Sequence, residues 1–148
     1  MHTRLWEENV GKKAPFRIVE HKEPFETPDA EYPLLLSTGR RLQFYNTGVQ
    51  TSDYQRVKDA EEFFELCEED AAKYGISDGQ MVLVESRRGF VITKARISNK
   101  LYPGLVWMAF HFPDEVNTNV LTINATDPLS GTAEFKACAV RVEPAWNI

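Results

Sequence analysis

The sequence predicts a mainly β protein with short helices, folded as a barrel. Short apolar runs bounded by glycine or proline recur along most of its 148 residues, and one segment has the composition of a helix. There is no internal repeat and no low-complexity segment. This length supports a single hydrophobic core.

Six of these runs are expected to be strands, because each is short, apolar and closed by turn residues. One face of the run 90–97 should carry Val91, Thr93, Ala95 and Ile97, and the other face Phe90, Ile92, Lys94 and Arg96. Residues 52–62 are charged and predict a mobile loop or a short turn of helix. The predicted strands are 32–37, 63–66, 81–86, 90–97, 105–112 and 137–144.

One short helix is predicted within residues 67–80, "CEEDAAKYGISDGQ". Three acidic residues, 68–70, stand where the helix dipole favours negative charge, and Ala71 and Ala72 are strong helix formers. Gly75 supplies a left-handed residue after the last turn. Residues 1–32 are polar and rich in Lys, Glu and Pro, and we expect an extended lead-in to a barrel domain over 33–148.

Composition excludes several classes of function. The net charge of −5 argues against nucleic-acid binding, and no apolar run reaches the length of ~18 residues that a membrane span needs. Cys67 and Cys138 stand alone, so we expect buried thiols rather than a disulfide or a metal site. Their usage suits a reducing, cytoplasmic compartment.

The segment "STGRRLQFYNTG", residues 37–48, has the composition of a binding loop. Its glycines, Gly39 and Gly48, permit close backbone approach and positive φ, and Arg40 or Arg41 offers a fork suited to phosphate. Thr38, Thr47 and Asn46 add hydroxyl and amide groups. Together these groups suit a ligand that combines phosphate with a planar heterocycle. The alternative is a polar turn that merely connects two strands.

A second polar segment, residues 117–126, holds six Asn and Thr side chains between apolar runs. Such a density of neutral hydrogen-bonding groups fits recognition of heterocycle edges, and the alternative is a surface loop with Asx turns. His111 precedes it and has an alternative reading as a packed residue near a strand end. Because no nucleophile–base pair, phosphate loop or metal-ligand cluster is present, we assign no catalytic residue and no metal ligand.

Four stretches in this order resemble one known family. The chain is similar to the C-terminal molybdopterin-dinucleotide-binding domain of molybdenum or tungsten oxidoreductases, above all the formate dehydrogenase alpha (catalytic) subunit. The resemblance covers roughly residues 30–144. It is carried by "YPLLLSTGRRL" with "YNTGVQT", "EEDAAKYGISDGQMVLVESRRGFV", "PGLVWMAFHFPDEVNTNVLT" and "DPLSGTAEFKACAVRVE".

The resemblance implies a six-stranded double-psi β-barrel of the aspartate decarboxylase-like type. It also implies that the domain closes over bis(molybdopterin guanine dinucleotide), carrying Mo or W, in an enzyme that oxidises formate to CO2. The implied partners are the remaining domains of the catalytic subunit and electron-transfer subunits. The implied cofactor-binding residues are Thr38, Gly39, Arg40, Arg41, Asn46, Thr47, Gly48, His111, Asn119, Thr122 and Lys136.

The chain departs from the family at three positions, with Asn46, Gln50 and Ala133 where relatives often carry His, Met and Pro. It also lacks the family's iron–sulfur cysteine motif and its metal-ligating Cys or selenocysteine. We therefore expect a piece of a larger catalytic subunit that is inactive alone. The alternatives are the equivalent domain of a nitrate reductase or a formylmethanofuran dehydrogenase, and a cofactor-free barrel that serves as an interaction module.

Overall fold

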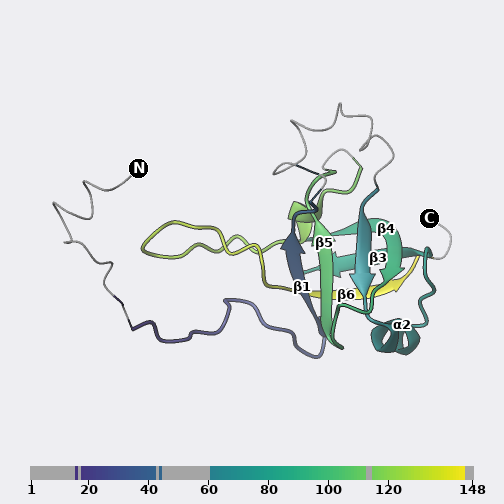
Figure 1. Ribbon diagram of the computed structural model, residues 1–148, viewed down its shortest axis with the longest axis horizontal. Coiled ribbons are helices and arrows are strands. Elements are labelled where there is room, and N and C mark those ends of the chain that lie inside the picture. Colours follow the sequence, from purple (N-terminus) through teal and green to yellow (C-terminus); the bar gives the residue numbers. More distant parts are fainter. Residues whose placement is uncertain (1–15, 17, 43, 45–60, 113–114, 146–148) are drawn as a thin grey trace.

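Six strands close into a barrel in the computed structural model, which describes residues 16, 18–42, 44, 61–112 and 115–145. The strands are β1 (Leu34–Gly39), β2 (Phe63–Leu66), β3 (Met81–Ser86), β4 (Gly89–Ile97), β5 (Leu105–Ala109) and β6 (Cys138–Pro144). They follow the order β1-β5-β2-β4-β3-β6 around the barrel (Figure 1). The pairs β1–β5 and β2–β4 are parallel, and the others are antiparallel. This confirms the predicted mainly β fold, a double-psi barrel.

β1 begins two residues later and ends two residues later than predicted. Pro33, just before it, has no amide hydrogen to donate to a sheet ladder. Thr38 and Gly39 pair with Met108 and Ala109 of β5 and are therefore strand residues rather than loop residues. The predicted polar loop thus begins at residue 40.

The predicted helix is confirmed as α2 (Glu68–Tyr74), with Gly75 in the left-handed conformation at φ 67° after its last turn. Cys67 caps its first turn, because the Cys67 sulfur accepts a hydrogen bond from the Asp70 amide at 3.4 Å. Cys67 and Cys138 are both buried and free, as expected. Cys67 has a further role, because it caps α2.

The core fills the inside of the barrel with residues that alternate along the strands. Along β4, Val91, Thr93 and Ala95 point inward as predicted, whereas Ile97 at the strand end is 37% exposed. The side chains with no or almost no exposed surface include Leu34, Leu36, Phe64, Leu66, Val82, Val84, Val106, Met108, Leu121 and Val140.

One end of the barrel collects the segments that carry the predicted binding residues. The parallel strands β1 and β5 both end there, and β2 and β6, each antiparallel to one of them, both begin there. The short 3-10 helix η1 (Thr118–Leu121) lies at the same end, above the barrel in Figure 1. We call this end the upper rim and define it as residues 38–41, 61–62, 109–112, 118–122 and 135–137. Helix α2 lies at the opposite end (Figure 1).

The lead-in has no helix or strand among its described residues and is tied to the barrel near its end. Glu26 is 8% exposed and accepts hydrogen bonds from Arg88 at 2.8 and 2.7 Å and from the Ala139 amide at 3.0 Å. Tyr32 is buried, and the Arg87 and Arg141 guanidinium groups lie 4.5 and 5.3 Å from the centre of its ring. These contacts join the segment to the barrel.

Residues 123–137 form a long arm that leaves the barrel beside the lead-in (Figure 1). Its two sides are joined by a bridge between Thr126 and Ala133, and Gly131 turns the chain at φ 69°. At its tip, the Asp127 carboxylate accepts the amides of Leu129 and Ser130. No described helix is long and apolar enough to cross a membrane.

Candidate functional site

The upper rim brings together every predicted binding residue that the structure describes. Asn46, Thr47 and Gly48, together with the predicted mobile loop at 52–60, lie outside the described residues. The sequence also predicts that the two polar segments, 37–48 and 117–126, meet at one rim with Asn46 near Asn119, and this closeness stays a prediction. The predicted residues located on the rim are Thr38, Gly39, Arg40, Arg41, His111, Asn119, Thr122 and Lys136.

Lys136 joins the start of β6 to the end of β1. Its ammonium group donates a hydrogen bond to the Thr38 carbonyl at 3.0 Å. In return, the buried Thr38 hydroxyl donates to the Phe135 carbonyl at 2.5 Å. The Thr38 hydroxyl is thus occupied within the protein, whereas the Lys136 ammonium group keeps two further donors.

Arg40 and Lys136 line one small cavity at the rim, with a volume of about 190 Å³, together with Phe110 and Phe135. The two phenyl rings meet edge to face, with centroids 5.6 Å apart. Within the described part of the chain, neither cation forms an ion pair with an acidic side chain. Two unneutralised cations beside aromatic rings are a donor set that fits an anionic ligand carrying a planar ring.

Gly39 is required by packing rather than by its backbone conformation. It is an extended strand residue and does not use the positive φ that a glycine permits. A β-carbon at this position would lie 2.7 Å from the Trp107 indole nitrogen on the neighbouring strand. The absence of a side chain at Gly39 leaves room for the Trp107 indole to pack across β1.

Gly39→Ala is expected to lower the free energy of unfolding by about 1–3 kcal/mol, since the new methyl group must displace the Trp107 ring. Urea denaturation of the two chains measures the difference. Ser37→Ala on the same strand is the matched control and should change the free energy by less. Equal midpoints for Gly39→Ala and the wild type would contradict the packing argument.

Arg41 turns into the barrel wall instead of toward a ligand. Its guanidinium group donates to the Glu61 carbonyl at 3.0 Å and to the Glu62 carboxylate at 3.3 Å, and it lies 3.8 Å from Glu65. The Phe63 ring lies below it, at 5.3 Å. Arg40 therefore offers the more accessible fork for phosphate of the two predicted arginines.

Glu62 is a rim residue that our sequence analysis missed. Its side chain is fully buried at the start of β2 and accepts hydrogen bonds from the Ala109 and Phe63 amides, each at 3.0 Å. Burial raises the pKa of Glu62 to about 7, although these donors and Arg41 act to lower it. The two-residue period of a strand could have revealed Glu62, because residues 62, 64 and 66 alternate with 63 and 65 and are all buried.

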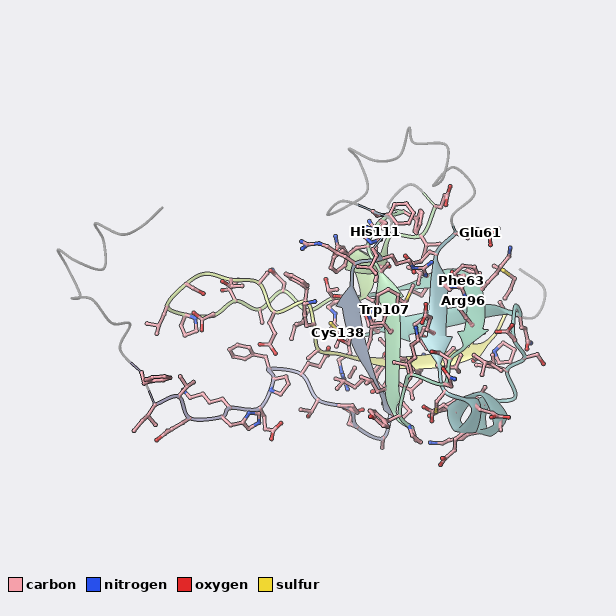
Figure 2. The ribbon with its side chains drawn as sticks, viewed as in Figure 1. Glu61, Phe63, Arg96, Trp107, His111 and Cys138 are labelled. Carbon is pink, nitrogen blue, oxygen red and sulfur yellow. The ribbon has the colours of Figure 1, made fainter. Side chains whose placement is uncertain are left out.

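His111 is packed, as our alternative reading proposed, and also makes a specific bond. It is 5% exposed, and its Nε2 atom accepts the Arg41 amide at 2.7 Å. The Phe44 ring stacks on it with centroids 4.8 Å apart and an interplanar angle of 19°. His111 lies at the top of the barrel in Figure 2. It fixes the chain just beyond β1.

The second polar segment forms η1 and its flanks. Thr118 anchors it, because the buried Thr118 hydroxyl donates to the Ala109 carbonyl at 2.6 Å. The Thr122 hydroxyl closes the helix by donating to the Asn119 carbonyl at 3.0 Å. Asn117 accepts the Asn119 amide, which is the Asx turn of our alternative reading. The exposed Asn119 side chain remains available on the rim.

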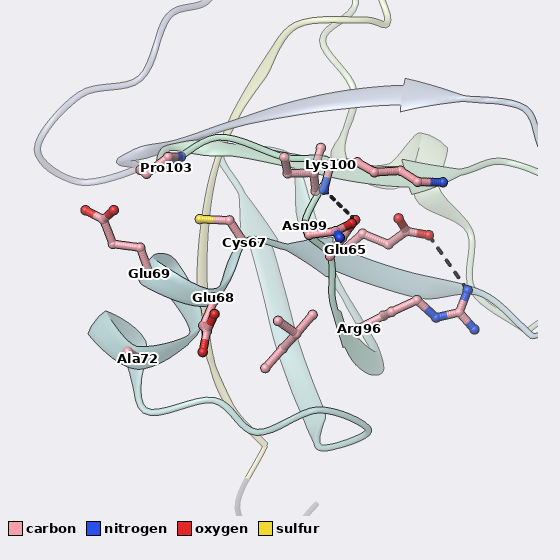
Figure 3. Close-up of a pocket in the computed structure, with 12 residues that line it drawn as sticks. Glu65, Cys67, Glu68, Glu69, Ala72, Arg96, Asn99, Lys100 and Pro103 are labelled. Atoms are coloured by element: carbon pink, nitrogen blue, oxygen red, sulfur yellow. Dashed lines mark hydrogen bonds and ion pairs between the residues drawn. The ribbon is translucent and has the colours of Figure 1, made fainter.

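A larger groove, of about 1010 Å³, lies away from the rim, beside α2. Glu68 and Glu69 of α2 line one side, and Asn99, Lys100 and Pro103 of the β4–β5 connection line the other (Figure 3). None of the predicted binding residues borders this groove. The larger volume of the groove therefore does not make it the binding site. The cations at the upper rim make the rim the candidate site.

Comparison with known proteins identifies relatives of most of this chain. The F420-dependent formate dehydrogenase 2 subunit alpha of Methanococcus maripaludis is 46% identical over 136 residues, covering 90% of this chain and 20% of that protein. A nitrate reductase of Symbiobacterium thermophilum is 45% identical over 138 residues, covering 90% of this chain and 18% of that protein. The chain thus spans about a fifth of the length of these relatives.

A solved structure shares the fold. Acetylene hydratase from Pelobacter acetylenicus superposes with a TM-score of 0.65 at 14% identity, covering 96% of this chain and 20% of that one. Residues 34–139 match the family described as "Molydopterin dinucleotide binding domain", a match that runs from the first residue of β1 into β6. The chain belongs to the molybdopterin-dinucleotide-binding domain family.

Proposed function

We propose that the chain is the cofactor-binding domain of a formate dehydrogenase-like catalytic subunit and that its upper rim holds bis(molybdopterin guanine dinucleotide). The observation that carries this proposal is that two cations, Arg40 and Lys136, line one rim cavity and form no ion pair with an acidic side chain among the described residues. The metal of the bound cofactor, Mo or W, supplies the two-electron chemistry of formate oxidation to CO2. Formate as the substrate is supported by the similarity to alpha subunits of F420-dependent formate dehydrogenases, at 46%, 42% and 41% identity.

The residues of this chain bind and orient in that function. Lys136 and Arg40 place positive charge beside phosphate or pterin oxygens, and Asn119 presents an amide to a heterocycle edge. Thr38 and Gly39 hold the backbone of β1 against β5 and β6. We propose the same binding role for Asn46, Thr47 and Gly48 in the loop beyond Arg41. His111, Arg41 and Thr122 act through the backbone that they hold.

Lys136→Ala and Arg40→Ala, made separately in the complete catalytic subunit, are each expected to weaken cofactor retention. Loss of one charge-assisted hydrogen bond costs about 1.5–3 kcal/mol, which corresponds to a loss of affinity of roughly tenfold or more. Pterin and metal content after purification measure the loss. Lys100→Ala, in the groove beside α2, is the matched control. Normal content in both rim variants would overturn the assigned roles.

A nitrate reductase is the second candidate, because the identity to such an enzyme, 45%, is almost the same. Assay of the complete subunit with formate and with nitrate separates the two activities.

A cofactor-free interaction module is distinguished by adding guanosine diphosphate to the chain and following the rim amides by NMR. Shifts at Arg40 and Lys136 would support a nucleotide site.

We also propose how the domain is placed in the larger protein. Residues 1–32 enter from a preceding part of the subunit, and residues 33–148 form the barrel, as the Glu26 contacts at the end of the lead-in support. The partners are the remaining domains, which carry the iron–sulfur cluster, and electron-transfer subunits. Two free, buried cysteines support a cytoplasmic location.

A further inference from the structure

One oxygen atom of Glu62 gathers donors from three segments of the upper rim. Glu62 Oε1 accepts the Ala109 amide at the end of β5 and the Phe63 amide in β2, both at 3.0 Å. It also accepts the Arg41 guanidinium group, which comes from the chain beyond β1, at 3.3 Å. The Thr93 hydroxyl of β4 holds the Glu62 carbonyl at 3.0 Å. Four of the six strands, or the chain leaving them, therefore meet at this residue.

The same contacts extend to the residues that face the ligand. Arg41 is held at two points, by Glu62 at its guanidinium group and by His111 at its amide, so the orientation of the adjacent Arg40 depends on both. The Ala109 carbonyl accepts the Thr118 hydroxyl, which anchors η1. Glu62 is thus joined by one hydrogen bond to Arg41, on one side of the rim, and by another to Ala109, on the other side.

We propose that Glu62 is a positioning residue for the cofactor, whose ionised carboxylate holds Arg41 and the ends of β1 and β5 in the shape that the cofactor meets. The proposal rests on the proposed function, because it assigns Glu62 a role toward the same rim. Glu62 touches no ligand itself and acts through Arg41 and Ala109.

The second carboxylate oxygen of Glu62 makes the contact between Glu62 and Arg41 dependent on pH. Glu62 Oε2 is buried and has no hydrogen-bond partner among the described residues. It can take up a proton while Oε1 keeps the bonds from the Ala109 and Phe63 amides, and the uncharged carboxyl then holds the Arg41 guanidinium group more weakly. Because burial raises the pKa of Glu62 to about 7, this change falls near neutral pH.

The charged groups around Glu62 are already paired. Glu61 on the same strand end is bound by Lys94 of β4 at 2.6 Å. Glu65 lies between Arg41 and Arg96, at 3.8 and 3.9 Å. The Nε2 atom of His111, beyond β5, accepts the Arg41 amide. Among these carboxylates, Glu62 is the one with a buried oxygen that has no hydrogen-bond partner among the described residues.

NMR titration of the 148-residue chain from pH 5.5 to 8.5 tests the link. We expect the Ala109, Arg41 and Arg40 amide signals of the wild type to shift with one midpoint, near the Glu62 pKa of about 7. Glu62→Gln should abolish the shared transition. Glu61→Gln, which removes the neighbouring exposed carboxylate, is the matched control and should keep it.

A second measurement ties the transition to the cofactor. The intact catalytic subunit should release pterin faster at pH 6 than at pH 8, and Glu62→Gln should make the two rates equal. The proposal is overturned if the Ala109 signal does not titrate, if Arg40 and Arg41 do not follow it, or if release keeps its pH dependence in Glu62→Gln. Normal cofactor content in the Arg40 and Lys136 variants would instead count against the proposed function alone.

Discussion

Glu26→Ala is expected to lower the free energy of unfolding by about 3 kcal/mol, although residue 26 lies in the polar lead-in. The carboxylate is 8% exposed and is bound by both Arg88 amino groups and by the Ala139 amide. Alanine leaves Arg88 without its acidic partner and the Ala139 amide, buried in β6, without an acceptor. Urea denaturation at pH 7 measures the change.

The control for this variant is Glu23→Ala, in the same segment, where the side chain is 77% exposed and pairs with His21. It should change the free energy by less than about 0.5 kcal/mol. Burial raises the pKa of Glu26, but the bonds from Arg88, Ala139 and Arg87 outweigh it, so the pKa lies below 4.5. Its contribution is therefore present above that pH and is lost on acidification. Equal stability of the two variants would show that the lead-in is not anchored at Glu26.

The stability of the wild type is expected to fall between pH 5 and 8.5 through a contribution from Glu62. Burial raises the pKa of Glu62 from 4.5 to about 7, so the folded chain holds this proton more tightly than the unfolded chain does. The contribution is complete below pH 4.5 and is lost as the pH rises through 7. The difference between the pKa of Glu62 in the folded and in the unfolded chain corresponds to at most about 3 kcal/mol.

Glu62→Gln should remove this decline, because glutamine is uncharged at every pH and resembles the protonated acid. The measurement is the unfolding free energy by urea at pH 5, 7 and 8.5, compared between the two chains. Glu61→Gln, with its carboxylate at the surface beside Lys94, should keep the wild-type slope. An unchanged slope in Glu62→Gln would mean that another group produces the pH dependence.

The strands and the helix could be predicted because their signals are local. Alternation along β4 and the acidic start and glycine end of α2 need only neighbouring residues to be read. The end of β5 could not be predicted this way. The chain beyond Ala109 remains apolar, but Ala109 itself bonds to Glu62 and Thr118, and these partners come from distant segments.

The site was predictable in its composition and only partly in its geometry. Arg40 was proposed from the composition of its loop and Lys136 from the family resemblance, and both line one cavity. The inward turn of Arg41 was not foreseen, because two adjacent arginines are equivalent until a buried acid distinguishes them. Glu62 itself was read as part of a charged loop, since a carboxylate is rarely placed inside a barrel without donors that only the folded chain provides.

The closed ring of six strands also limits how this domain can meet other chains. Each of the six strands pairs with a neighbour on both sides, so none of them offers a row of open amides and carbonyls to an approaching strand. Edge-to-edge aggregation, the usual hazard of a β-rich fragment, has no template in this ring. Contact with the rest of an enzyme must then use side chains, or the arm and the lead-in, which extend beyond the ring (Figure 1).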